Sequence, residues 1–109
     1  MLQSEIYDLL SGTGLKAYYY EADKNTSLPY IVYFTDSAAA WGADEENFLR
    51  KDSYIVEFYS ARKDFENQKK IETALDKAGI NYSVNETNIE EEKMYMVAFT
   101  FDITRKVER

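Results

Sequence analysis

The stretch from Met94 to Ile103 constrains the fold most, because its apolar side chains recur at every second position. A period of two is typical of a β-strand that buries one face. The residues on that face are Tyr95, Val97, Phe99, Phe101 and Ile103. Burial of each large apolar side chain contributes about 1.5–3 kcal/mol, so we expect other aromatic strands and at least one helix to cover this face.

The composition predicts a single globular domain spanning residues 1–109. Hydrophobic residues make up 45% of the chain and aromatic residues 16%, which is more than disordered chains carry. A chain of 109 residues is large enough for one core and too small for two. Cysteine and histidine are absent, which excludes disulfides, thiolate catalysis, and the commonest general base and transition-metal ligand. We therefore expect no cofactor and no metal site.

The charge balance argues against ordinary nucleic-acid binding. Thirteen Lys and Arg residues stand against twenty Asp and Glu residues, giving a formal net charge of -7, and such a surface repels phosphate backbones. The first residues lack the basic and apolar regions of a signal peptide, and no stretch is long enough to cross a bilayer. We expect a chain that is neither exported nor bound to a membrane.

The order of elements predicts an α+β fold. Helical spacing of apolar residues indicates helices over residues 2–11 and from a cap at Asp64 to a terminator at Gly79. Strands are predicted over residues 16–21, 30–35, 53–61, 80–84 and 94–103. The resulting order, α-β-β-β-α-β-β, favours a mostly antiparallel five-stranded sheet with two helices packed chiefly on one face. The strand, helix and strand of residues 54–84 allow two strands to run parallel.

Residues 36–50 break every period, and we expect an irregular loop. At about fifteen residues it is longer than most connections in a compact domain, which favours a functional role. Trp41 is the only tryptophan. It either folds back onto the core or forms an exposed anchor that docks on another subunit, since Trp and Tyr dominate interface hot spots. Phe48 and Leu49 are the other candidate anchors, with Asp44 as a charge at the rim of the same interface.

No residue pattern supports catalysis, and we expect that the protein is not an enzyme. The acidic runs Asp44–Glu46 and Glu90–Glu92 are typical of solvated turns, because consecutive carboxylates point in alternating directions and do not converge on one ion. No Gly-x-Ser-x-Gly occurs, and without histidine no usual catalytic triad forms. The three tyrosines at 18–20 lack the basic groove that accompanies base stacking, so we interpret them as core and interface residues.

An ordered set of short segments resembles a family of phage proteins. The similar segments, spread from about Leu28 to Ile103, are Leu28–Tyr33, Ala43–Asp44, Tyr54 with Glu57 and Tyr59, Asp64 with Glu72 and Leu75, Gly79–Tyr82, and Glu90–Tyr95. The family is that of the tail-terminator, or tail-to-head joining, proteins of long-tailed bacteriophages and Gram-positive prophages. The segment Ala38–Gly42 departs from it, because a more polar stretch is expected there.

The resemblance implies a structural role in a virion. Such proteins form a ring, usually a hexamer, on the end of the tail tube, stop its polymerisation and present a surface to the head connector. The implied partners are other copies of the chain, the tail tube protein and the connector protein, with DNA passing through the lumen without specific binding. The implied location is the virion tail, and the host cytoplasm during assembly.

A second hypothesis is an acidic phage-encoded inhibitor or adaptor that occupies a nucleic-acid-binding host protein by imitating a phosphate array. It requires carboxylates spaced along one surface, whereas the acidic residues here gather in turns and on the predicted helix. Binding of that kind weakens steeply as ionic strength rises, and a ring held by aromatic contacts does not.

Overall fold

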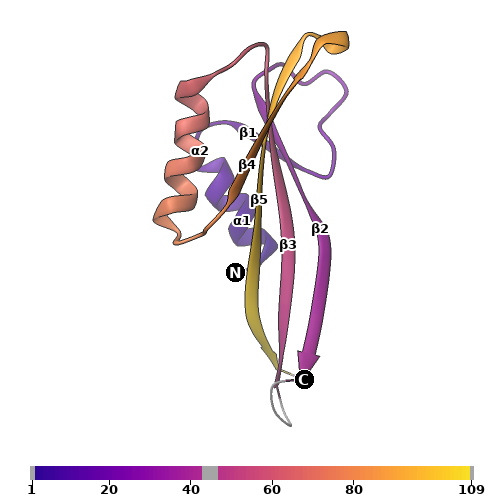
Figure 1. Cartoon of the computed structure of the whole chain (residues 1–109), viewed down its shortest axis with the longest axis vertical. Helices are drawn as coiled ribbons and strands as arrows, with labels where there is room; N and C mark the ends of the chain where they lie inside the picture. The colour runs from indigo at the N-terminus through magenta and orange to yellow at the C-terminus, as the bar shows by residue number, and fades with distance from the viewer. Residues whose placement is uncertain (1, 43–46, 109) are drawn as a thin grey trace.

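The structure, a computed structural model, describes residues 2–42 and 47–108. Its elements in chain order are α1 (Gln3–Ser11), β1 (Lys16–Tyr19), β2 (Tyr30–Gly42), β3 (Asn47–Ser60), α2 (Phe65–Lys77), β4 (Ser83–Ile89), the short 3₁₀ helix η1 (Glu90–Glu92) and β5 (Met94–Glu108). This order confirms the predicted α-β-β-β-α-β-β arrangement and the α+β class (Figure 1).

Within the described residues, one five-stranded sheet has the strand order β1-β2-β3-β5-β4. The pairs β2–β3, β3–β5 and β4–β5 are antiparallel, and β1 pairs in parallel with β2. The sheet is therefore mixed, although mostly antiparallel as predicted. β3 and β4 run in the same direction because each is antiparallel to β5, which lies between them.

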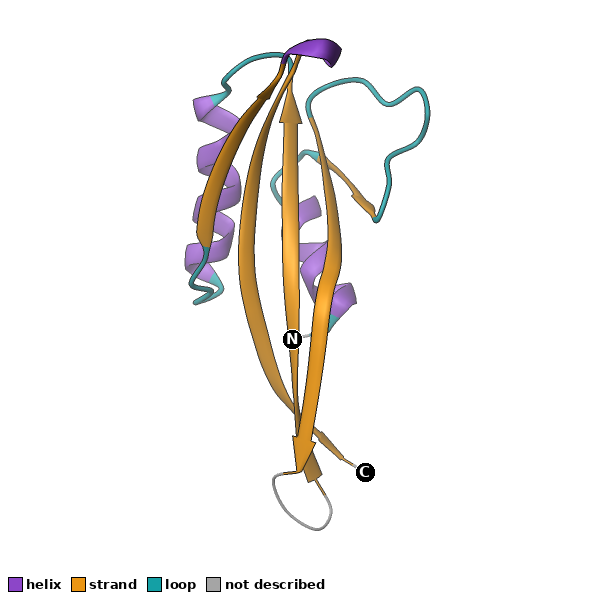
Figure 2. Cartoon of the chain, turned by 45° about the vertical axis from the view of Figure 1, so that its right-hand side comes forward, coloured by secondary structure: helices purple, strands orange, loops and turns teal. Residues whose placement is uncertain are grey.

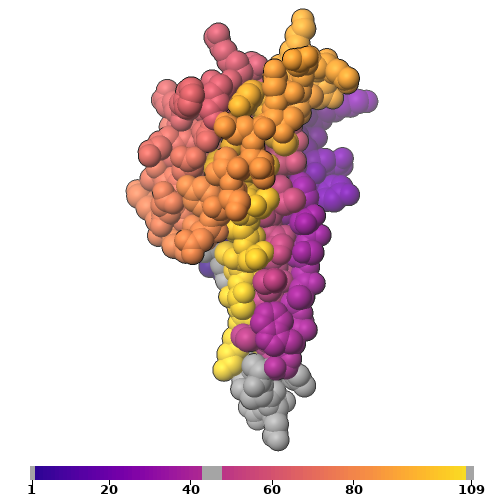
Figure 3. All heavy atoms as spheres, viewed as in Figure 1, coloured from indigo at the N-terminus to yellow at the C-terminus, as the bar shows by residue number. Residues whose placement is uncertain are grey.

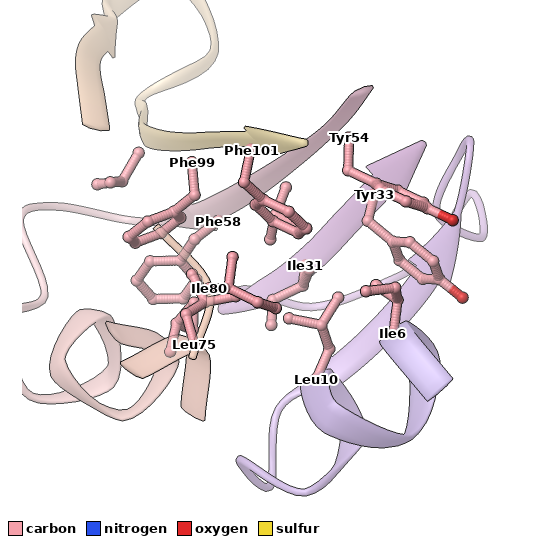
Figure 4. Packing of buried hydrophobic residues seen from close by; sticks show 13 residues of the cluster. Ile6, Leu10, Ile31, Tyr33, Tyr54, Phe58, Leu75, Ile80, Phe99 and Phe101 are labelled. Atoms are coloured by element: carbon pink, nitrogen blue, oxygen red, sulfur yellow. The ribbon is translucent and has the colours of Figure 1, made fainter. Parts of the chain in front are cut away.

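Both helices lie on the same side of the sheet, which Figure 2 shows from its uncovered side. The helices contribute Ile6, Leu10, Ile71 and Leu75 to the buried cluster, and none of these side chains is more than 1% exposed. Figure 4 shows Ile6, Leu10 and Leu75 facing the buried aromatic residues of the strands, which include Phe58 and Phe99. We call this side of the sheet the helix side and the opposite one the outer face.

The predicted boundaries of α2 are confirmed by its caps. The Asp64 carboxylate accepts a hydrogen bond from the Asn67 amide at 3.0 Å, which satisfies one of the unpaired donors at the start of the helix. Gly79 has a φ of +72°, a left-handed conformation that glycine adopts at low cost. The Ile80 amide then donates to the Leu75 carbonyl. The chain therefore turns back toward the sheet directly after the helix.

The prediction of an irregular loop is wrong for residues 36–42 and 47–50, because β2 continues to Gly42 and β3 begins at Asn47. The rest of the predicted loop, residues 43–46, lies outside the described residues. The two strands pair from Ser37 opposite Ser53 to Gly42 opposite Phe48, after a register shift between Thr35 and Ser37. The β2 part of this extension is exposed. No buried face therefore selects alternating apolar residues there, and the period of two that would reveal a strand is missing.

The strand predicted over residues 80–84 is present, but it begins and ends later in the chain than predicted. Ile80 and Tyr82 lie before β4, which runs from Ser83 to Ile89. Ile80 is 7% exposed and belongs to the core, and the Tyr82 ring packs edge-on against Phe99 with centroids 5.7 Å apart. Ile80 and Tyr82 alternate with polar residues because both side chains pack on the core in the segment that precedes β4. β4 itself is largely exposed, so apolar residues do not mark it.

Part of the sheet projects beyond both helices as a narrow three-stranded ribbon (Figures 1 and 3). We call this ribbon the arm and define it as residues 36–42 of β2, 47–53 of β3 and 102–108 of β5. The molecule measures 52 × 26 × 21 Å along its principal axes. The arm accounts for the elongated shape, while the helices and the paired strands between them form the wider body. No helix in the described part of the chain has the length and apolar character needed to span a membrane.

Candidate assembly interface

The three predicted anchors lie together at the far end of the arm. Trp41 on β2 is opposite Leu49 on β3, and Gly42 is opposite Phe48. Directly opposed residues of an antiparallel pair share a face, and successive residues alternate between faces. Trp41 and Leu49 therefore lie on the outer face and Phe48 on the helix side. Asp44 lies outside the described residues.

Trp41 is a surface residue. Its exposed fraction is 45%, and it is not part of the buried cluster. Of the two alternatives, folding back onto the core is therefore wrong, and docking on another subunit stays a prediction. Phe48 and Leu49 are partly buried. A partly exposed aromatic residue beside an apolar neighbour, at the end of a projection, is suited to contact with another protein.

A charged cluster holds the helix side of the arm together near its base. Asp52, which is 5% exposed, accepts a hydrogen bond from the Nε of Arg50 at 2.9 Å. Its other carboxylate oxygen lies 3.9 Å from the Nε of Arg105. Arg50 and Arg105 are direct cross-strand partners on β3 and β5. Asp52 therefore offsets the repulsion between two adjacent guanidinium groups.

A second polar contact joins the same two strands on the outer face. The Ser53 hydroxyl donates a hydrogen bond to the Asp102 carboxylate at 2.6 Å, and these two residues are opposite each other in the register. Asp52 and Ser53 are consecutive, so the Asp52–Arg105 and Ser53–Asp102 contacts join β3 to β5 on opposite faces of the arm at neighbouring positions. Side-chain contacts between β3 and β5 therefore add to the backbone hydrogen bonds at the base of the arm.

The apolar core ends next to this level. The rings of Tyr54 and Phe101 stack with centroids 5.7 Å apart, and both residues are at most 5% exposed. Burial, and then the nearby Asp52 carboxylate, raise the pKa of the Tyr54 hydroxyl above its ordinary value. Burial therefore favours the neutral form of the Tyr54 phenol over the ionised form.

Both edges of the arm lack a neighbouring strand in the described structure. β1 pairs with β2 only from Tyr30 to Tyr33. β4 pairs with β5 only from Met94 to Thr100. The outer edges of residues 36–42 and 102–108 therefore present backbone amide and carbonyl groups to solvent (Figure 2). Unpaired edges of this kind are templates for pairing with another chain.

The outer face of the body carries tyrosines and carboxylates. The Tyr59 hydroxyl donates to the Glu57 carboxylate at 2.9 Å, and burial followed by this hydrogen bond raises the pKa of Tyr59. Beside them lies a cleft of about 420 Å³, whose acidic lining residues are Glu21, Asp23, Glu57 and Glu92. Among the residues that the structure describes, no three His, Cys, Asp or Glu side chains are arranged to hold a metal ion. The absence of a cofactor stays a prediction.

The tyrosines at positions 18–20, in β1 and directly after it, contact the aromatic residues of β2. Tyr18 packs edge-on against Tyr30, and Tyr19 against Tyr33, with centroid distances of 6.4 and 5.3 Å. Tyr20 has a φ of +74° and a ring 6.4 Å from that of Phe34. Tyr19 and Tyr20 nevertheless remain 42% and 72% exposed. Tyr18 and Tyr19 belong to the edge strand β1, Tyr20 follows it, and the core lies mainly on the other strands.

The arm and the charged cluster at its base were not predicted from the sequence. One feature of the sequence pointed to the charged cluster. Asp52 falls in phase with the buried residues of the same strand, which are Tyr54, Val56 and Phe58. A carboxylate on a buried face needs a cationic partner, and Arg50 follows the same alternation. Arg105 carried no such signal, because its position opposite Arg50 depends on the register of β3 and β5.

Comparison with known proteins gives a likeness in fold. No family model matches the chain, and no curated protein matches it. A chain of a solved structure described as the virion of a native gene transfer agent (GTA) particle superposes with a TM-score of 0.65. The match covers 99% of this chain and 95% of that chain at 16% sequence identity. The two chains therefore share a fold across their whole length.

Proposed function

We propose that this chain is a structural virion protein without catalytic activity, which forms a ring on the end of a phage tail tube. In this role it ends tube polymerisation and joins the tail to the head connector. Its partners are further copies of itself, in a hexamer when assembled, together with the tail tube protein and the connector protein. It resides in the virion tail, and in the host cytoplasm during assembly.

The observation that carries this proposal is the fold shared with a chain of a virion particle over 99% of the length. It agrees with the resemblance of the segments between Leu28 and Ile103 to tail-terminator proteins. The shape adds support, because a body with a projecting, unpaired ribbon has more surface for neighbours than a closed domain does. Trp41 and Leu49 place apolar surface at the end of that ribbon.

The charge distribution is compatible with a channel for DNA. The chain carries a formal net charge of -7, and carboxylates gather around the cleft on the outer face of the body. A surface of that sign does not hold a passing phosphate backbone. We propose that DNA passes through the ring without a specific binding site.

The proposal is tested on purified tail tubes of the phage or prophage that encodes the chain. Tubes are incubated with the protein, and added tube protein is then given the chance to extend them. We expect the treated tubes to stop growing and to show extra density at one end in electron micrographs. Sedimentation of the protein with and without tubes measures whether rings form in solution or only on a tube end.

A matched pair of variants makes this test specific. Trp41→Ala removes an aromatic side chain from the arm, and Phe65→Ala removes one that is 75% exposed on the body. We expect Trp41→Ala to impair capping and Phe65→Ala to leave it unchanged. Tubes that elongate equally with and without the unaltered protein would contradict the proposed function.

A further inference from the structure

We propose that neighbouring copies of this chain join through the two edges of the arm. Residues 37–42 of β2 in one copy pair in parallel with residues 102–107 of β5 in the next. This inference rests on the proposed function, because it names the surface through which the copies of the proposed ring contact one another. Its partner is a second copy of the same chain.

The β2 edge lacks the features that usually protect an edge strand. Proteins block free edges with proline, with charged side chains, or by keeping the strand short. From Ser37 to Gly42 the sequence is Ser-Ala-Ala-Ala-Trp-Gly, without charge or proline. The three alanines are exposed and leave the backbone accessible. This edge therefore accepts another strand without a steric or electrostatic barrier.

The β5 edge is charged, and this difference selects between the possible pairings. Arg105 and Lys106 lie in the middle of the free segment. Two β5 edges paired around Arg105 or Lys106 would oppose like charges, which is unfavourable. A β5 edge beside the alanines of β2 meets no charge of either sign. The charges on β5 thus favour the mixed pair over a pair of two β5 edges.

Strand direction makes the mixed pair suitable for a ring. β2 and β5 run in the same direction, because each is antiparallel to β3 between them. They also lie at opposite edges of the same ribbon. Copies that stand side by side with their arms aligned therefore place β5 of one parallel to β2 of the next. Every copy uses both edges in such a head-to-tail contact. A series of these contacts forms a closed ring when the rotation between neighbouring copies is a whole fraction of a full turn.

The cross-strand rows show what would meet at this contact. Trp41, Leu49 and Lys106 form one row on the outer face, and Ala39, Lys51 and Thr104 form another. Neighbouring strands lie about 4.8 Å apart. Where two copies are level, Thr104 of one therefore comes beside Ala39 of the next. Lys106 likewise comes beside the Trp41 ring, where a cation–π contact is favourable.

Cysteine cross-linking tests this pairing directly, because the chain contains no cysteine of its own. Ala39→Cys is mixed in equal amounts with Thr104→Cys under mild oxidation, alone and on tail tubes. Ala39→Cys is also mixed with Asp102→Cys and with Lys106→Cys, which shift the contact by one row along the same face. Non-reducing gels measure the dimers, and reduction must reverse them.

We expect one of the three mixtures to cross-link at least about tenfold faster than a control mixture, because paired strands hold the thiols at millimolar effective concentration. The control is Ala39→Cys mixed with Lys70→Cys, an exposed site on α2. The double variant of the productive pair should give a ladder of covalent oligomers. Dimers of Ala39→Cys alone at the same rate would instead indicate a symmetric β2–β2 contact and would overturn the proposal.

The outcomes separate this inference from the proposed function. Capping of tubes without cross-links above the Lys70→Cys control would refute the edge pairing and leave the proposed function intact. Cross-linked oligomers that fail to cap tubes would refute the proposed function and retain the edge pairing. Each cysteine variant is first compared with the unaltered chain by circular dichroism, so that a misfolded protein is not scored.

Discussion

Trp41 and Leu49 face each other across β2 and β3 on the outer face of the arm, and 45% of the Trp41 surface is exposed. Burial of an aromatic side chain contributes more to binding than that of most other residues. Apolar surface at this position adds nothing to the core, which lies on the helix side of the body. This placement supports the proposed contact of Trp41 and Leu49 with another protein.

Replacing Trp41 and Phe48 together with alanine should prevent ring formation and leave the fold intact. The side chains lie at the end of the arm, away from the buried cluster, so we expect the free energy of unfolding to fall by no more than about 1 kcal/mol. Particle mass measured by light scattering on tube ends or in solution reports assembly, and urea unfolding reports stability.

Phe99→Ala provides the contrast for this double variant. Phe99 is fully buried, and its truncation should cost about 3–5 kcal/mol. Ring assembly that continues unchanged in the Trp41 and Phe48 double variant would count against the arm as the interface.

Assembly should also change the fluorescence of Trp41, the only tryptophan. An exposed indole emits at longer wavelength than one that is covered by protein. We therefore expect a blue shift when copies associate, in step with the increase in particle mass. The Lys106→Ala variant removes the cation proposed to meet the ring and should weaken the association. A particle mass that rises without any change in emission would place Trp41 outside the contact.

Asp52→Ala should loosen the arm without unfolding the body. The variant leaves Arg50 and Arg105 opposite each other without the carboxylate that contacts both. We expect a local cost of about 1–2 kcal/mol, because like charges across a strand pair repel and a buried ion pair loses one partner. Amide hydrogen exchange should become about tenfold faster over residues 48–52 and 103–107, and stay unchanged at Phe99.

Asp102→Ala is the matched control, because it removes the same charge from the other face at the same level. Asp102 is exposed and accepts one hydrogen bond from Ser53, so its loss should have a smaller effect. Equal exchange in the two variants would show that the charged cluster does not stabilise the arm.

Stability should decline in strongly alkaline solution. Burial raises the pKa of the hydroxyls of Tyr33 and Tyr54 above the ordinary value of 10.0. Above pH 10 the unfolded chain loses these protons while the folded chain keeps them, so the free energy of unfolding is at its full value below pH 10 and falls as the pH rises further. The loss is at most about 1.4 kcal/mol per pH unit for each tyrosine.

Urea unfolding at pH 9 and pH 11 measures this effect, and tyrosinate absorbance should appear together with unfolding. Tyr54→Phe removes one of these buried hydroxyls and should make the decline shallower. An unfolding free energy that is equal at both pH values, in the unaltered chain, would contradict the assignment of these phenols as buried and neutral.

Strong periodicity made the body predictable from the sequence. The alternation in residues 94–103 and 53–61 identified the faces that Phe99 and Phe58 bury, because packing on one side selects every second residue. Local chemistry identified both ends of α2 through Asp64 and Gly79. These features depend on neighbours in the chain, so a single sequence reveals them.

The arm depends on contacts between distant segments and was therefore not predictable. Residues 36–42 are extended because β3 pairs with them, and β5 continues to Glu108 because β3 pairs with it there as well. A strand exposed on its outer face needs no alternation, so the alanines and Trp41 gave the pattern of a loop. Trp41, Phe48 and Leu49 were proposed as interface residues from their type alone, while their division between two faces required the register.

The long pairing of β3 with β5 has a mechanical consequence. The two strands stay in one register from Phe48 opposite Val107, in the arm, to Ser60 opposite Tyr95, in the body. A pull on one of these strands along its axis therefore loads many backbone hydrogen bonds in shear together, and does not break them one after another. A subunit built in this way resists sliding of β3 against β5 over the whole distance from the tip of the arm to the body.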